Sequence, residues 1–199
     1  TDIRQVRHKI VKDVPIQQTE TVVDDPVQQI KRLMSEDQYG HAVRFGRIAR
    51  PALVAASRAA PSLYLVLAEF DVHYGLALVY IGDVHDGVPL LKAIIAKGEA
   101  GQKPEDVASQ GNPHSLEGSH RNFVLGRAHN NLGYAYWKEQ GHFELALREF
   151  HKALFYFRTS DLLEEEANTC DNMGRVYAEM GKRIPAEKWI QEGLALRRK

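Results

Sequence analysis

The last third of the chain contains a sequence pattern that occurs twice, about forty residues apart. Residues 130–136 read Asn-Asn-Leu-Gly-Tyr-Ala-Tyr, and residues 171–177 read Asp-Asn-Met-Gly-Arg-Val-Tyr. A chain with such an internal period consists of supersecondary units that cannot bury their apolar faces alone and therefore stack on their neighbours. The repeat predicts an array of similar units.

Each copy carries small and large residues at fixed positions. Small residues let two antiparallel helices approach closely, and large residues fill the space between them. In the first copy these repeat positions are Leu132, Gly133, Tyr136, Gly141, Ala146 and Phe150, and in the second they are Met173, Gly174, Tyr177, Gly181, Ala186 and Ile190. Each copy therefore predicts a hairpin of two helices.

This pattern resembles the tetratricopeptide repeat (TPR), which has Leu-Gly-x2-Tyr in its first helix and Ala-x3-Phe in its second. The resemblance implies an all-α fold, a right-handed superhelix of antiparallel helix hairpins known as an α-solenoid. The chain departs from the family at His129 and Cys170, which occupy the position of a large residue. Its period is also longer than the usual ~34 residues.

We predict about four hairpins, of which the first two are degenerate. The two clear hairpins occupy 119–199, and the degenerate pair occupies 25–97. In detail, the expected hairpins are 25–58, 61–97, 119–158 and 160–198.

Two further segments lie outside the predicted hairpins. Residues 1–24 show little helical periodicity, so we expect an extended or disordered leader. Residues 98–118 contain four glycines and two prolines and predict a long loop, either functional or a flexible insertion.

Composition and motifs argue against several functional classes. Lys plus Arg and Asp plus Glu both number 26, which gives no general attraction to nucleic acid or to an anionic membrane. No uncharged apolar run is long enough for a membrane span, and a single cysteine is typical of a reducing, cytoplasmic location.

The residues that could carry chemistry do not form a known motif. The stretch 174–182 has the wrong spacing for a phosphate loop, and the nine histidines contain no H-E-x-x-H. Acidic neighbours of Cys170 would raise the pKa of its thiol, so we expect this cysteine to be buried and inert. We predict no enzyme activity, no cofactor and no metal site.

The resemblance implies which side chains line a binding groove. In the TPR family the first helices of successive hairpins form a concave face that binds peptides or helices of partner proteins. Matched position by position, the candidates are Arg127, Asn130, Asn131, Tyr134 and either Trp137 or Lys138 in the third hairpin, Asn168, Asp171, Asn172, Arg175 and Glu179 in the fourth, and Glu69, His73 and Leu76 in the second.

Asn131 and Asn172 are the most specific of these candidates. In several TPR families an asparagine at this position bonds the backbone of an extended peptide, because a side-chain amide both donates and accepts. The alternative is that each asparagine bonds a neighbouring helix of the array. The acidic stretch 160–180 also has two interpretations: it is either a docking patch for a basic partner or a solvated face.

The resemblance implies a non-catalytic scaffold that binds a protein or peptide partner. The style of the repeat is similar to TPR arrays in larger bacterial signalling and regulatory proteins. Two alternatives remain open: a regulatory domain that senses an effector or signal peptide, and a self-association module. The apolar residues Trp189, Ile190, Leu194 and Leu196 near the end of the fourth hairpin favour the last.

Overall fold

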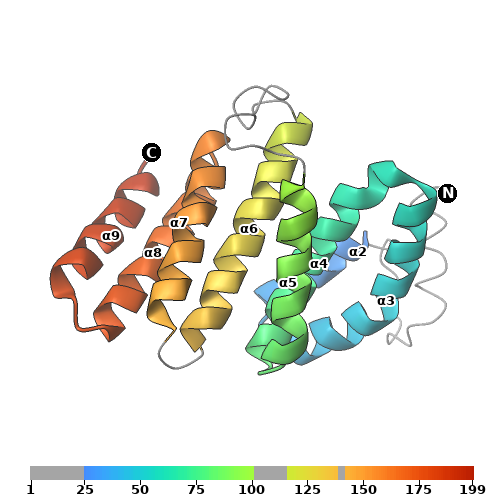
Figure 1. Cartoon of the computed structure of the whole chain (residues 1–199), viewed down its shortest axis with the longest axis horizontal. Coiled ribbons are helices and arrows are strands. Elements are labelled where there is room, and N and C mark those ends of the chain that lie inside the picture. Colours follow the sequence, from blue (N-terminus) through green and yellow to red (C-terminus); the bar gives the residue numbers. More distant parts are fainter. Residues whose placement is uncertain (1–24, 101–115, 139–141) are drawn as a thin grey trace. The chain divides into compact units, whose positions relative to one another are not determined.

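The computed structural model describes residues 25–100, 116–138 and 142–199 of the 199-residue chain. Within these ranges all regular secondary structure is helical (Figure 1). The α-helices are α2 (Pro26–Ser35), α3 (Tyr39–Ala59), α4 (Tyr64–Tyr80), α5 (Val84–Glu99), α6 (Leu116–Lys138), α7 (Phe143–Thr159), α8 (Leu163–Glu179) and α9 (Arg183–Leu196). The predicted all-α, helical-repeat fold is confirmed.

The chain divides inside α5, after Leu90, into two units that each have their own internal packing. Unit 1 contains α2, α3, α4 and the first part of α5. Unit 2 contains the rest of α5 and the helices α6 to α9.

Unit 1 begins with a capped helix. The Asp25 side chain accepts a hydrogen bond from the backbone N–H of Val27 at 3.0 Å, and Pro26 occupies the first helical turn, where its missing N–H costs nothing. The apolar face of α2 then packs with α3 and α4 around Ile30 and Phe70, which are both fully buried. This core holds the three helices together.

The helix α4 is apolar on all sides and lies at the centre of unit 1. The stretch Pro61–Tyr80 is long and apolar enough to cross a membrane by length and composition, with a mean hydropathy of 1.3. We expected no such segment because Glu69 and Asp71 interrupt the run. In the structure, 61% of this window is buried inside the protein, and both carboxylates pair with basic residues, Lys31 and Arg50. These are the properties of a core helix.

Gly46 allows α3 to approach α4 closely. A Cβ atom at this position would lie 2.2 Å from the ring of Tyr74, which is itself buried. We predict that Gly46→Ala destabilises unit 1 by about 1–3 kcal/mol because the ring must move. Gly40 in the same helix has no atom near its added Cβ, so Gly40→Ala should be neutral or stabilising by about 0.5 kcal/mol. Hydrogen exchange of the α3 amides measures both changes, and equal effects would contradict the prediction.

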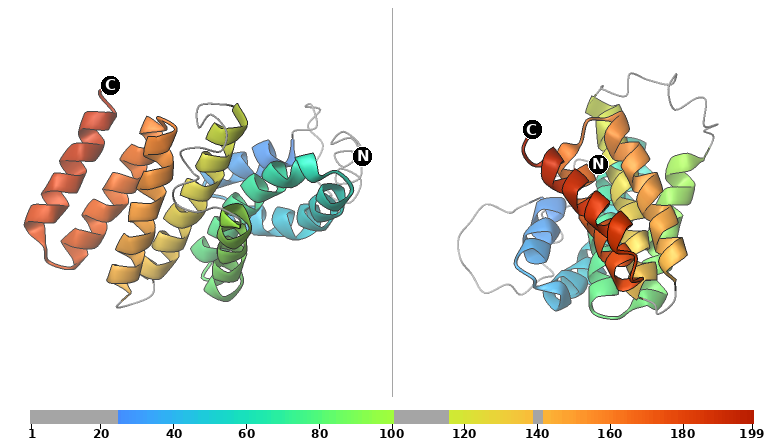
Figure 2. Two further views of the ribbon diagram at one scale, coloured as in Figure 1. Left: turned by 45° about the horizontal axis from the view of Figure 1, so that its top comes forward. Right: turned by 90° about the vertical axis from the view of Figure 1, so that its left-hand side faces the viewer.

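Besides the end of α5, unit 2 contains two helical hairpins, α6–α7 and α8–α9, whose four helices lie side by side (Figures 1 and 2). Gly133 lies against Phe150 and the backbone of Ala146, so that α6 and α7 approach closely. In the second hairpin, Gly174 lies in the same way against Ile190 and the backbone of Ala186. The small and large repeat positions thus meet inside each hairpin.

The core of unit 2 runs between the two hairpins. It contains Leu147 and Leu154 of α7 with Ala167, Cys170 and Val176 of α8, and all five are buried. Tyr136 and Tyr177 pack against this core from its edge.

The predicted loop 98–118 is shorter at both ends than expected. Helix α5 continues to Glu99 and α6 begins at Leu116. Gly98 is helical and lies close to Leu125, where a Cβ added to the glycine would come within 2.5 Å of the leucine side chain. The predicted leader 1–24, the middle of the loop and the repeat position Gly141 lie outside the described residues.

Candidate functional site

The first helices of the two clear hairpins, α6 and α8, are joined by a polar network. The Asn130 Oδ1 atom accepts hydrogen bonds from Asn172 Nδ2 at 3.1 Å and from Thr169 Oγ1 at 3.3 Å. These bonds fix α8 against α6. We call the surface of these two helices that carries Arg127, Asn130, Tyr134, Trp137, Lys138, Asn168, Asn172, Arg175 and Glu179 the α6–α8 face.

Asn131 does not belong to this surface. Its side chain is 1% exposed, so it is inside the protein and presents nothing to a partner. Asn172 is half-buried, and its amide N–H donates to Asn130 of the neighbouring helix. This is the alternative in which the asparagine bonds within the array rather than to a peptide. The structure also corrects the prediction for His73, which is buried in α4.

Aromatic rings and a lysine gather at the C-terminal end of α6. The rings of Tyr134 and Trp137 meet edge to face, with centroids 5.6 Å apart. Lys138 Nζ lies 5.1 Å from the centroid of Tyr134 and 5.3 Å from that of Trp137, within the range of a cation–π interaction. The indole Nε1–H donates to Glu179 Oε2 at 2.7 Å, which links the cluster to α8. Both alternatives for this position, Trp137 and Lys138, therefore belong to one cluster.

At the other end of the face, ion pairs connect the helices. Arg127 Nη2 lies 2.7 Å from Glu165 Oε1, and its guanidinium is placed over the ring of Phe123. Arg197 Nη2 bonds Asp171 Oδ2 at 2.6 Å and Asn168 Oδ1 at 3.1 Å. Asp171 and Asn168 are thus tied to the end of α9.

The acidic stretch 160–180 is not an unpaired acidic patch. Besides the pairs of Glu165 and Asp171, Glu166 accepts from Arg158 Nε at 2.6 Å and is buried. Three of its carboxylates therefore have arginine partners within the unit. The hypothesis of a docking patch for a basic partner is wrong for these three residues, because their charges serve to join helices.

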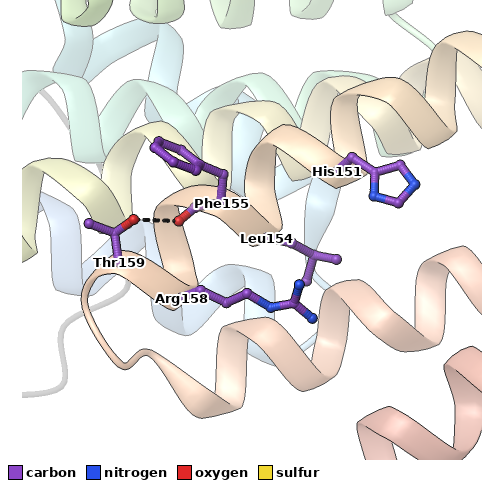
Figure 3. A pocket seen from close by; sticks show the side chains of 5 residues that line it. All are labelled: His151, Leu154, Phe155, Arg158 and Thr159. Atoms are coloured by element: carbon purple, nitrogen blue, oxygen red, sulfur yellow. Dashed lines mark hydrogen bonds between the residues drawn. The ribbon is translucent and has the colours of Figure 1, made fainter. Parts of the chain in front are cut away.

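A pocket that the sequence did not indicate lies on α7 (Figure 3). It has a volume of about 400 Å³ and is lined by His151, Leu154, Phe155, Arg158 and Thr159. These residues follow the helical i, i+3, i+4 spacing and so share one face of α7. Burial and the charge of Arg158 lower the pKa of His151, which favours its neutral form. The pocket is open to solvent rather than enclosed.

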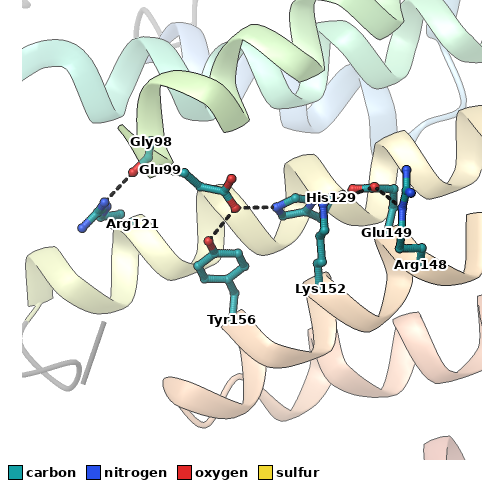
Figure 4. Close-up of polar contacts among 8 residues, drawn as sticks. All are labelled: Gly98, Glu99, Arg121, His129, Arg148, Glu149, Lys152 and Tyr156. Atoms are coloured by element: carbon teal, nitrogen blue, oxygen red, sulfur yellow. Dashed lines mark hydrogen bonds and ion pairs between the residues drawn. The ribbon is translucent and has the colours of Figure 1, made fainter. Parts of the chain in front are cut away.

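A buried cluster of titratable residues joins α5, α6 and α7 (Figure 4). His129 has a fully buried side chain between Glu149, at 2.8 Å from its Nδ1 atom, and Glu99, at 3.1 Å from its Nε2 atom. Tyr156 donates to the same Glu99 oxygen at 2.8 Å, and burial and this bond raise its pKa. The only sequence signal for this cluster is a histidine in the position of a large apolar residue.

Neither thiol chemistry nor metal binding is favoured in the described part of the chain. No group of three or more His, Cys, Asp or Glu residues there is placed to hold a metal ion. Burial first, and then the nearby Glu192 and Glu166, raise the pKa of the Cys170 thiol to about 12. The thiol is therefore protonated at neutral pH, as expected from the sequence.

Comparison with known proteins shows structural similarity but no family. No family model matches the chain, and no curated protein matches it. A solved structure described as "MamA MSR-1 C2" is 20% identical in sequence, with a TM-score of 0.33. The similarity covers 85% of this chain and 98% of that one.

Proposed function

We propose that this chain is a non-catalytic scaffold that binds a protein or peptide partner through the α6–α8 face. The observation that carries the proposal is the cluster of Tyr134, Trp137 and Lys138 at one end of this face. Tyrosine and tryptophan concentrate at the energetic centres of protein interfaces because they bury a large apolar area and keep a polar group for orientation.

The rest of the face suits an extended peptide lying along the two helices. Arg175 is exposed on α8, and Glu179 and Lys138 provide charge of both signs near the aromatic rings. The amides of Asn130 and Asn172 bond each other, so a peptide would find these groups partly satisfied. The aromatic cluster, rather than an asparagine pair, is therefore the main anchor in this proposal.

The cluster also defines the test. A phage-displayed library of unstructured peptides is selected on the wild-type chain, and the Kd of a selected peptide is measured by calorimetry. For the double variant Tyr134→Ala, Trp137→Ala we expect binding at least about thirtyfold weaker, because a single hot-spot residue contributes about 2 kcal/mol or more.

The matched control is Phe155→Ala, which removes an exposed ring from the pocket on α7 and should leave the Kd unchanged. Circular dichroism checks that the helical content of each variant is intact. Equal Kd values for the double variant and the wild type would contradict the proposal, as would a library that yields no binding peptide.

Self-association is a second candidate function, and one observation favours it. Helix α9 exposes Ile184 (82%), and Ile190 and Leu194 on the same helix are also exposed. Apolar side chains gathered on one helix are a common feature of interfaces. Light-scattering mass across a range of protein concentrations separates this function from the first: a constant monomer mass excludes it.

The remaining parts of the proposal rest on the sequence. We propose a cytoplasmic module of a larger regulatory protein that contacts neither nucleic acid nor membrane. The alternative of an effector-sensing domain would need an enclosed site, and the pocket on α7 is open.

A further inference from the structure

In the buried cluster around His129, the positions of the hydrogen-bond acceptors indicate how many protons the imidazole carries. The imidazole has no exposed surface, and each of its two nitrogens lies within hydrogen-bond distance of a carboxylate oxygen. A neutral imidazole carries one N–H, and its other nitrogen is an acceptor. An ionised carboxylate can only accept. A neutral His129 would therefore leave one pair of acceptors facing each other.

The alternative is that one of the two glutamates is protonated, and their surroundings argue against it. Glu99 is 41% exposed and its Oε1 atom already accepts from the Tyr156 hydroxyl. Glu149 is buried, which alone would raise its pKa, but the hydrogen bond with His129 and the charge and hydrogen bond of Lys152 act against burial, and the pKa of Glu149 is lowered.

Two basic groups of α7 also face Glu149. Lys152 Nζ and Arg148 Nε lie 3.4 Å and 3.5 Å from its Oε1 atom. The two oxygens that face the imidazole, Glu149 Oε2 and Glu99 Oε1, therefore both act as acceptors, and each takes an N–H from the imidazole.

We propose that His129 is doubly protonated in folded unit 2 and acts as a proton-dependent latch between the end of α5 and the α6–α7 hairpin. The imidazolium belongs to α6, Glu99 is the last residue of α5, and Glu149 and Tyr156 belong to α7. The imidazole also stacks on the Tyr156 ring, with centroids 5.6 Å apart and planes 11° apart. If the imidazole loses its Nε2 proton, the hydrogen bond between His129 on α6 and Glu99 on α5 is replaced by two acceptor atoms that repel each other.

The latch makes the stability of unit 2 depend on pH in a defined direction. In an unfolded chain a histidine loses its second proton near pH ~6.5. Above that pH the folded state would hold one proton more than the unfolded state, so stability falls as pH rises. The folding equilibrium constant then decreases about tenfold per pH unit for as long as the latch keeps its proton.

Nitrogen NMR of the wild-type chain labelled at histidine tests the proton count directly. At a pH of about 7.5, where an ordinary histidine is neutral, we expect two protonated ring nitrogens for His129. Free histidine measured under the same conditions provides the reference spectrum of the neutral form. A neutral spectrum for His129 would overturn the proposal.

A variant tests the consequence for folding. Both tryptophans, Trp137 and Trp189, lie in unit 2, so their fluorescence reports its unfolding in urea. Between pH ~7 and ~8.5, His129→Gln should remove the tenfold-per-unit decrease that the wild type shows. His85→Gln is the control and should keep the wild-type decrease of the folding equilibrium constant with pH. If His129→Gln has the wild-type slope, His129 is not the latch.

A milder variant covers the case in which His129→Gln does not fold. Glu99→Gln keeps an acceptor for His129 and Tyr156 but removes one negative charge from a partly exposed position. We expect a folded protein with a smaller pH slope than the wild type, and an unchanged slope would contradict the latch.

Discussion

Replacing Arg50 with methionine is expected to destabilise unit 1 by about 3–5 kcal/mol, because it leaves a buried carboxylate without its partner. Arg50 Nε donates to Asp71 Oδ1 at 2.8 Å and Nη2 donates to Asp71 Oδ2 at 3.1 Å. The Asp71 side chain is only 6% exposed, so water cannot replace the guanidinium. The pair joins α3 to α4, and urea unfolding followed by circular dichroism measures the loss.

The effect should depend on pH and on Asp71. Burial raises the pKa of Asp71 even with Arg50 in place. Removing Arg50 should raise the pKa of Asp71 further, because the guanidinium favours the ionised carboxylate. An acid with a raised folded-state pKa gains a proton on folding, so the destabilisation of Arg50→Met should shrink as the pH is lowered from 7 toward that pKa.

The double variant Arg50→Met, Asp71→Leu serves as the control and should recover most of the loss, since no buried charge remains. A double variant as unstable as the single one would contradict the assignment, as would a loss that does not change with pH.

Replacing Phe150 with alanine is expected to destabilise unit 2 by about 3–5 kcal/mol. The ring is fully buried and fills the space next to Gly133, so its removal leaves a cavity between α6 and α7. Tryptophan fluorescence in urea measures the change because Trp137 and Trp189 both lie in this unit.

A second substitution tests the contact itself. A Cβ atom at Gly133 would lie 2.8 Å from the Phe150 ring, so Gly133→Ala should be destabilising in the wild type. In the Phe150→Ala background the added methyl group no longer meets the ring. Gly133→Ala should therefore lower the free energy of unfolding by less than it does in the wild type. Additive effects would show that the two residues do not share the contact.

The fold could be predicted from the sequence because the repeat is a local pattern with a packing meaning. Gly133 and Phe150 are 17 residues apart, and the corresponding small and large residues of the second hairpin, Gly174 and Ile190, are 16 apart and meet in the same way. The ends of the helices were less predictable. Gly98 is a helix breaker by propensity, yet it lies inside α5, where it is close to Leu125 and its carbonyl oxygen accepts a hydrogen bond from Arg121.

The candidate site was only partly predictable, because successive residues of a helix point about 100° apart. The sequence placed Asn130 and Asn131 together on one surface, whereas the structure exposes part of the first and buries the second. A small rotation of α6 about its axis decides between them, and this rotation depends on packing with other helices.

The cluster around His129 was outside the reach of sequence analysis. Glu99 and Glu149 are 30 and 20 residues from His129, and no local spacing relates them. The departure of His129 from the repeat consensus was visible, and it indicated a polar group in an apolar position. Its partners became known only when the helices were placed side by side.

The apolar surface of α4 has a consequence for how this protein behaves in a cell. While α2 and α3 are docked, they cover much of a helix that is apolar on every side. Each opening of unit 1 exposes this helix to chaperones, proteases and other apolar surfaces, and the time spent open rises about tenfold for each 1.4 kcal/mol of lost stability. Substitutions such as Arg50→Met should therefore lower the amount of protein that accumulates well before they change how the folded form binds a partner.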